Sequence, residues 1–110
     1  MADTGVELLQ GTLDLLILKA LALGPLHGWG VAKRIQQMSR DVLTVNQGSL
    51  YPALYRLENR GFIASEAGKS PEGRRITLYR PTAAGRRMLA EKIGAWETFA
   101  AAVGHVISHA

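Results

Sequence analysis

The sequence contains no cysteine, which excludes a disulfide framework, a thiol nucleophile and a cysteine-based zinc site. Because disulfides are rare in reducing compartments, the absence of cysteine suits a cytoplasmic protein, which is what we expect. The first ten residues carry no lysine or arginine, whereas a secretory signal begins with a basic segment. We therefore expect no secretory signal in this chain.

Long hydrophobic runs and catalytic motifs are also missing. The longest apolar stretch, residues 15–26, is interrupted by Lys19 and is too short to span a bilayer, so we expect no membrane partner. The sequence has no glycine-rich phosphate loop and no serine–histidine–aspartate arrangement. His105 and His109 have a helical spacing that suits a metal, but no third ligand is apparent. We expect no enzyme, no cofactor and no metal site.

What is present is a short chain with an uneven charge. Its 110 residues, 47% apolar and 20% charged, are typical of one small globular domain. Residues 46–87 contain eight lysines or arginines and three glutamates, whereas residues 1–45 are neutral and residues 88–110 carry a net charge of −1. A basic central segment suits a surface that binds a polyanion, although an ordinary solvated surface could have the same composition.

Apolar periodicity predicts two helices in the first forty residues. The first runs from about Thr12, a suitable N-cap, to Leu23, and Gly24-Pro25 ends it. Apolar residues cover so much of its circumference that it should lie at the centre of the core. The second runs over about 29–39. The β-prone run at 42–45 predicts a short strand after it.

A third helix is indicated by leucines that repeat every three or four residues. We expect an irregular turn at 46–48 and a regular helix at 49–59 with Ser49 as its N-cap. An N-cap at Asn46 would place Pro52 deeper in the helix and would cost a hydrogen bond.

The rest of the chain predicts a hairpin and a long helix. Residues 62–67 and 74–80 alternate as strands do, and the turn-rich segment between them forms a basic, flexible tip. A final helix begins after Thr82 and runs to about Ser108. Its apolar residues recur at spacings of four and three, which predicts a seam for a second copy of the chain. The seam consists of Leu89, Ile93, Trp96, Ala100, Val103 and Ile107, with Phe99 beside it.

This order of elements is that of a winged helix-turn-helix, a mainly α fold with a small β-hairpin. Residues 1–82 would form the DNA-binding domain and residues 83–110 the dimerisation helix. The third helix has the width of the major groove, and the basic segment covers both this helix and the hairpin. We therefore predict a homodimeric regulator of transcription that binds double-stranded DNA. The alternative is a winged helix that binds protein, which would have little need of a cationic hairpin tip.

Four motifs resemble the PadR family of bacterial transcriptional regulators. They are Gln10–Leu18, Gly24–Gly28, Gln47–Leu57 and Thr82–Arg86. The resemblance covers residues 8 to about 97, and it implies a winged-helix dimer, usually a repressor. Only one C-terminal helix fits, as in the short form of the family. The chain resembles most a branch of the family whose genes often lie beside genes for transport permeases. This resemblance implies control of a neighbouring transporter gene.

The sequence departs from the family pattern at three positions. Trp29 stands where the family usually has tyrosine, Gly30 where it has a larger polar residue, and Pro81 where it has an aliphatic one. Glycine should loosen the second helix by roughly 0.5–1 kcal/mol relative to alanine. Pro81 cannot donate a ladder hydrogen bond, so the second strand should end there. None of the three lies on the surface expected to contact DNA.

The candidate DNA contacts lie off the leucine face of the third helix, on the hairpin tip and on the second helix. They are Gln47, Ser49, Tyr51, Tyr55, Arg56, Asn59 and Arg60; Lys69, Arg74 and Arg75; and Lys33 and Arg34. Arg56 is expected to enter the groove, and Gln47 could pair with a base edge, whereas turn chemistry is favoured for Asn46. The resemblance implies that the Tyr51 hydroxyl bonds a phosphate. The alternatives are a tyrosine packed on the hairpin and a solvated helix face.

Trp96 lies in the middle of the seam, with Phe99 nearby. In a two-fold dimer Trp96 would lie near its own copy, and plain packing is one interpretation. The other is a small aromatic effector held between the subunits by Trp96 and Phe99, which would couple its binding to the separation of the two DNA-reading helices.

Overall fold

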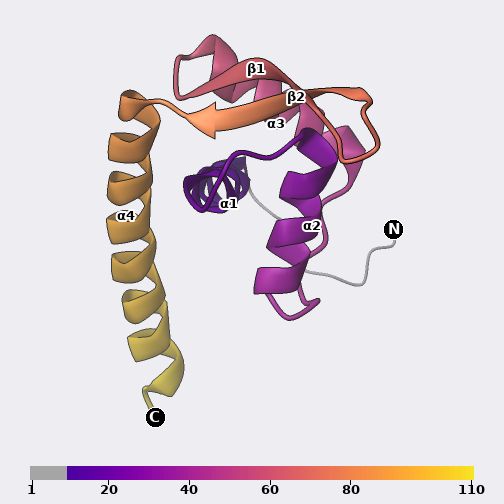
Figure 1. The fold of residues 1–110 in the computed structure, drawn as a ribbon. Helices are drawn as coiled ribbons and strands as arrows, with labels where there is room; N and C mark the ends of the chain where they lie inside the picture. The colour runs from indigo at the N-terminus through magenta and orange to yellow at the C-terminus, as the bar shows by residue number, and fades with distance from the viewer. Residues whose placement is uncertain (1–9) are drawn as a thin grey trace.

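The computed structural model describes residues 10–110, which form four helices and one antiparallel hairpin (Figure 1). In chain order the elements are α1 (Gln10–Ala22), α2 (Gly28–Met38), α3 (Gln47–Asn59), β1 (Ile63–Lys69), β2 (Arg75–Pro81) and α4 (Ala83–Ser108). The predicted fold class, mainly helical with a small hairpin, is confirmed.

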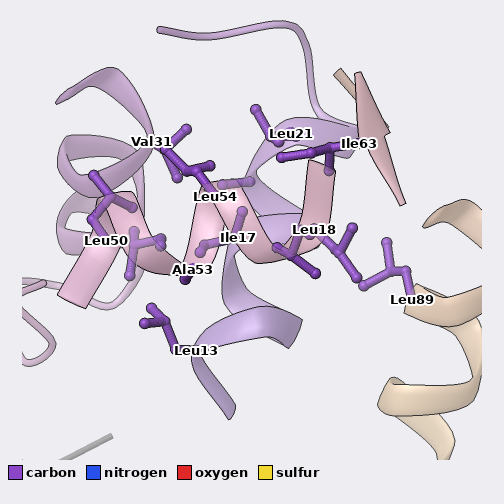
Figure 2. Packing of buried hydrophobic residues seen from close by; sticks show 13 residues of the cluster. Leu13, Ile17, Leu18, Leu21, Val31, Leu50, Ala53, Leu54, Ile63 and Leu89 are labelled. Carbon is purple, nitrogen blue, oxygen red and sulfur yellow. The ribbon is translucent and has the colours of Figure 1, made fainter. Parts of the chain in front are cut away.

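Helix α1 is the centre of the core, as its apolar circumference predicts. In Figure 1 it is seen nearly end-on, with α2, α3, α4 and the hairpin around it, and it contacts all three other helices. Its residues Ile17 and Leu18 have no exposed surface. Figure 2 shows them among Leu54 of α3, Ile63 of β1 and Leu89 of α4. Burying this apolar surface is the main force that holds the elements together.

The predicted N-cap of the first helix is wrong. Helix α1 already includes Gln10 and Gly11, so Thr12 lies inside it. Thr12 and Leu15 border α4, whose Trp96 lines the same hollow. Packing against α4 supports helical backbone ahead of the residue that local preference favours as a cap.

The predicted strand at 42–45 is also wrong. This segment is irregular, and Leu43 and Val45 pack against the core instead of pairing with a strand. Leu26 pairs with Tyr79 of β2 in its place, through two backbone hydrogen bonds of 2.8 and 3.2 Å. The β-prone run at 42–45 does not pair with β2, because β1 lies along one edge of β2 and Leu26 pairs at the other.

Helix α3 begins earlier than predicted, at Gln47, with Asn46 as its N-cap. The Asn46 Oδ1 accepts a hydrogen bond of 2.8 Å from the Ser49 N–H, which satisfies one donor of the first turn. Pro52 therefore lies in the body of the helix and cannot donate to the Gly48 carbonyl. Gly48 and Pro52 are both exposed, so water can satisfy that carbonyl.

The hairpin matches its prediction to within two residues at each strand end. Ile63 pairs with Pro81 at its base and Lys69 with Arg75 at its tip. Strand β2 ends at Pro81, as expected for a residue without an N–H donor. The turn at the tip is closed by the Ser70 N–H, which donates to the Arg74 carbonyl over 2.8 Å.

Helix α4 begins and ends as predicted. The Thr82 Oγ1 accepts from the Gly85 N–H over 3.0 Å and donates to the Gly61 carbonyl over 2.6 Å, which joins the cap to the end of α3. The helix then extends away from the body, as Figure 1 shows. The radius of gyration is 15.2 Å, against about 13 Å for a compact chain of this size. No helix within residues 10–110 combines the length and apolar character needed to cross a membrane.

Candidate functional site

Two surfaces carry most of the predicted site residues. The first, here called the recognition face, consists of the exposed side of α3 and the tip of the hairpin. In Figure 1 the hairpin tip and the start of α3 lie at the end of the molecule away from α4. The exposed candidates on this face are Gln47, Ser49, Tyr51, Tyr55 and Asn59 of α3, and Lys69, Arg74 and Arg75 of the tip. The second surface, the α4 face, is described below.

Helix α3 presents its two tyrosines because its other side is buried. Leu50 and Leu54 have at most 1% of their surface exposed, whereas Tyr55 is 73% exposed. A tyrosine with so much exposed surface has both its ring and its hydroxyl available to a partner. Helical geometry thus places the polar and aromatic side chains of α3 on one accessible strip.

Tyr51 is held in place by α2. Its ring lies so near Gly28, the first residue of α2, that a Cβ at that position would be 2.7 Å from the ring. Gly28 is therefore required for this close approach. Tyr51 remains 44% exposed, so the contact orients the ring without removing it from solvent. Tyr51 is also near Tyr79 of β2, so packing on the hairpin remains an alternative to a phosphate contact.

Arg56 does not lie where the groove-contact prediction requires. Its Nη2 forms an ion pair of 2.5 Å with Oδ1 of Asp14 in α1. The Asp14 side chain is only 7% exposed and the Arg56 side chain 29%. A buried carboxylate needs a counter-charge, so Asp14 draws the guanidinium toward α1. The structure thus corrects the assignment of Arg56 to the groove. The sequence did not predict this pair because Asp14 and Arg56 are 42 residues apart, and no local pattern connects residues at that distance.

The two basic residues of α2 have different roles. Arg34 is half-buried, and its Nη1 donates to the carbonyls of Ala20 and Gly24 over 3.0 and 3.4 Å. These carbonyls lie at the end of α1, where a cation is favourable, so Arg34 has a structural task and its predicted phosphate contact is not supported. Lys33 is exposed, with its Nζ 4.8 Å from the centre of the Trp29 ring.

Arg60 lies at the opposite end of α3 from Gln47. It is the C-cap residue, and its guanidinium carbon is 5.4 Å from the centre of the Phe62 ring. A helix rises about 1.5 Å per residue, so thirteen residues separate these ends by about 20 Å. Arg60 is exposed, but it lies far along α3 from the first turn.

The hairpin tip concentrates positive charge and is anchored to α3. Lys69 and Arg75 are opposite each other in the strand register, and Arg74 is adjacent to them. Nearer the base, the Ser65 hydroxyl donates to Glu58 of α3 over 2.6 Å. This bond helps to fix the hairpin relative to α3.

Tyr79 lies on the inner side of the hairpin. Burial raises the pKa of its phenol, and the nearby Glu58 and Tyr51 add to the increase. The phenol is therefore neutral around pH 7, which suits a ring packed between the hairpin and the helices.

The α4 face is apolar and exposed. It is formed by Trp96, Phe99, Ala100, Val103, Val106 and Ile107. Leu89 and Ile93 were predicted to belong to the same seam, but Leu89 is only 9% exposed and lies in the core cluster, and Ile93 packs against that cluster. The first three turns of α4 thus serve the fold of the protomer itself, which corrects the predicted start of the seam.

A hollow of about 350 Å³ lies where α4 passes α1. Leu15 of α1 lines one side, and Trp96 and Phe99 line the other. The two aromatic rings are 6.3 Å apart and tilted by 44°. The predicted effector residues therefore come together at an open apolar hollow.

Comparisons with known proteins agree with this architecture. The chain matches the Transcriptional regulator PadR-like family over residues 17–91. It is 38% identical over 94 residues to Transcriptional regulator Rv3488 of Mycobacterium tuberculosis, and the match covers 86% of this chain and 84% of that protein.

Solved structures are also similar. A transcriptional regulator from Clostridium thermocellum, Cth-833, superposes with a TM-score of 0.79 at 29% identity, over 87% of this chain and 90% of that one. A PadR-like transcriptional regulator from Bacillus cereus has a TM-score of 0.80 at 22% identity, over 92% and 96% of the two chains, and shares the fold.

The family match covers more than half of the chain, and it includes the second half of α1 from residue 17, all of α2, α3 and the hairpin, and the start of α4. The resemblance inferred from the four motifs is thus confirmed, and the prediction that the chain is no enzyme agrees with the regulatory function of the family. This chain belongs to the PadR-like family of transcriptional regulators.

Proposed function

We propose that this regulator binds double-stranded DNA as a homodimer and represses transcription in the cytoplasm, with a neighbouring transporter gene among its targets. The observation that carries the proposal is the recognition face. It combines an exposed polar strip on α3 with three exposed cations at the hairpin tip, Lys69, Arg74 and Arg75. Such a pairing suits a helix in the major groove with a basic wing along the phosphates.

Each element of the recognition face has a distinct task in this proposal. Gln47 lies in the first turn of α3, where its amide can pair with an adenine edge. The hydroxyls of Ser49 and Tyr51 bond phosphates and set the register of the helix in the groove. Tyr55 and Asn59 extend the contact along α3, with Arg60 at its far end. Arg56 and Arg34 are not included, because their guanidinium groups bind within the protomer.

The homodimer is proposed from the α4 face. Residues 1–82 would form the unit that binds DNA, of which residues 1–9 lie outside the described part of the chain, and the exposed part of α4 would join two such units. Phe99 and Ile107 are 61% and 76% exposed, which is unfavourable for apolar side chains of this size unless a partner covers them. A symmetric pair would present two recognition faces, and its operator would have two half-sites about one helical turn, or roughly 34 Å, apart.

The hairpin tip provides the test of phosphate contact. Replacing Lys69→Ala should weaken binding uniformly across DNA sequences and reduce the slope of log affinity against log salt by about 2 per dimer, because each protomer loses one phosphate contact. The measurement is fluorescence anisotropy of labelled DNA from upstream of the chain's own gene, over a series of salt concentrations.

Arg87→Ala is the matched control, since Arg87 is exposed and basic but lies in the first turns of α4. If the two variants change the salt slope equally, the hairpin tip has no specific role in phosphate contact. If the unaltered chain fails to bind duplex even at low salt, the winged helix would instead be a module that binds protein. A footprint on the upstream DNA, with transcription assayed from the same fragment, tests repression and the transporter target.

A second candidate function is suggested by the α1–α4 hollow. Its lining by Trp96 and Phe99 favours a small aromatic effector, held where two copies of α4 would meet. In the Trp29→Phe variant Trp96 is the only tryptophan, and a bound planar aromatic compound should quench its emission saturably. Phe99→Ala should weaken that binding roughly tenfold, because the contact area of one ring is lost. A broad panel of aromatic compounds without any saturable quenching would contradict the effector site.

A further inference from the structure

Trp29 is half-exposed at the start of α2, beside the start of α3. Its side chain is 52% exposed, although tryptophan has the largest apolar surface of any residue. It borders a hollow of about 280 Å³ between the two helices. The polar residues that line this hollow are Lys33 and Gln36 of α2, Thr44 and Asn46 of the connecting segment, and Gln47 of α3. None of the described residues that line it is acidic.

The contacts of Trp29 keep a positive charge over its ring. Lys33 Nζ lies 4.8 Å from the ring centre, a distance at which a cation is attracted to the ring face. Neither of the two ion pairs formed among residues 10–110 includes Lys33. The ammonium group is therefore held beside the hollow without a carboxylate to neutralise it.

Gly30 supports this arrangement. The imidazole of His27 lies over Gly30, where a Cβ would be 3.0 Å from the ring. The same imidazole lies 6.3 Å from the Trp29 ring. A larger residue at position 30 would displace His27 from the side of Trp29. Glycine at position 30 thus leaves room for His27 beside Trp29.

We propose that Trp29 and Lys33 bind the sugar–phosphate backbone of the DNA strand that borders the groove entered by α3. This inference rests on the proposed function and extends it to a surface outside the recognition face. The indole face would pack on a deoxyribose, its Nε1–H would donate to a phosphate oxygen, and Lys33 would neutralise the same phosphate. A cationic hollow with amide and hydroxyl groups and no acid suits that occupant. Its position next to Gln47 places it at the edge of the groove.

The chain has only two tryptophans, which makes the test specific. Trp96→Phe leaves Trp29 as the sole emitter, and Trp29→Phe leaves Trp96 as the matched control on α4. Each variant is titrated at low salt with an end-labelled 20-base-pair duplex of arbitrary sequence, because phosphate contacts do not depend on sequence. Anisotropy of the label reports binding. We expect the duplex to quench Trp29 and to protect it from acrylamide, and to leave Trp96 unchanged.

Affinities of single variants in the otherwise unaltered chain provide an independent readout. Lys33→Met should lower the salt slope by about 2 per dimer, since one phosphate contact per protomer is lost. Trp29→Phe retains ring packing but loses the N–H donor, and it should weaken binding roughly tenfold if that donor bonds a phosphate. Thermal unfolding of each variant separates lost contact from lost structure.

The outcomes separate this inference from the function on which it rests. If the labelled duplex binds in a salt-dependent way while Trp29 emission and accessibility stay constant, the Trp29 site is refuted and the DNA-binding function stands. If the unaltered chain binds no duplex, both are refuted. If polyglutamate quenches Trp29 as strongly as duplex at equal charge, the hollow is a general anion site, which overturns its assignment to the DNA backbone.

Discussion

Val103→Glu is expected to convert the proposed dimer to a monomer and to weaken operator binding by roughly 10²- to 10⁴-fold, the range gained when two binding units are linked. Val103 is 37% exposed on the α4 face. It follows Trp96 by seven residues, so both lie in the same row of the helix. A carboxylate there would meet its own copy across a two-fold axis in an apolar seam, where an unpaired charge is costly. Light scattering coupled to size exclusion reports the mass, and anisotropy with operator DNA reports the affinity.

Ala101→Glu is the matched control for this substitution. Ala101 is exposed in the same turn of α4, and helical geometry places it on the side opposite Val103. Both variants add one glutamate to the same turn of α4, and they differ only in the face of the helix that carries it. A dimeric Val103→Glu protein, or equal loss of mass in both variants, would show that the α4 face does not join the protomers.

Arg56→Met is expected to destabilise the protein by about 3 kcal/mol or more, because it leaves the buried carboxylate of Asp14 without its partner. An arginine whose only role was to contact DNA would behave differently, since its loss would weaken binding and leave stability almost unchanged. Urea unfolding at a fixed protein concentration measures the effect, because the stability of a dimer depends on concentration.

The double variant Asp14→Leu, Arg56→Met identifies the cause. Replacing both partners of a buried ion pair by apolar side chains is often neutral, so the double variant should recover most of the lost stability. Arg60→Met is the control at the C-cap of the same helix, because Arg60 is exposed, lies over the Phe62 ring and belongs to neither ion pair formed among residues 10–110. If Arg56→Met leaves the unfolding midpoint unchanged and relaxes the DNA sequence preference, Arg56 contacts the groove as the sequence predicted.

The ion pair has a further consequence for how α3 is held. Asp14 and Arg56 join α1 to α3, and Tyr51 against Gly28 joins α3 to α2. Ser65 and Glu58 join α3 to the hairpin. Helix α3 is thus fixed on three sides by polar or aromatic contacts in addition to its leucines. A rigid helix loses little conformational entropy on binding, which favours affinity for a groove of matching shape.

Features coded within a few residues were predictable from the sequence. The Thr82 cap of α4, the end of β2 at Pro81 and the length of α4 each follow from local donors, missing donors and apolar spacing. The same is true of the exposed side of α3, because the leucine period leaves only one strip for polar residues. The basic segment and the family motifs then indicated the class of function.

Features that depend on distant segments were not predictable. Arg56 faces Asp14 rather than solvent, Leu89 belongs to the core rather than to the seam, and Leu26 rather than the run at 42–45 pairs with β2. In each case the local pattern allowed two positions, and the choice depended on a partner far along the chain. By itself, the sequence determined the elements, their order and the accessible strip on α3. Tertiary packing alone decided which charges and apolar groups are buried, because burial depends on what the rest of the chain places against them.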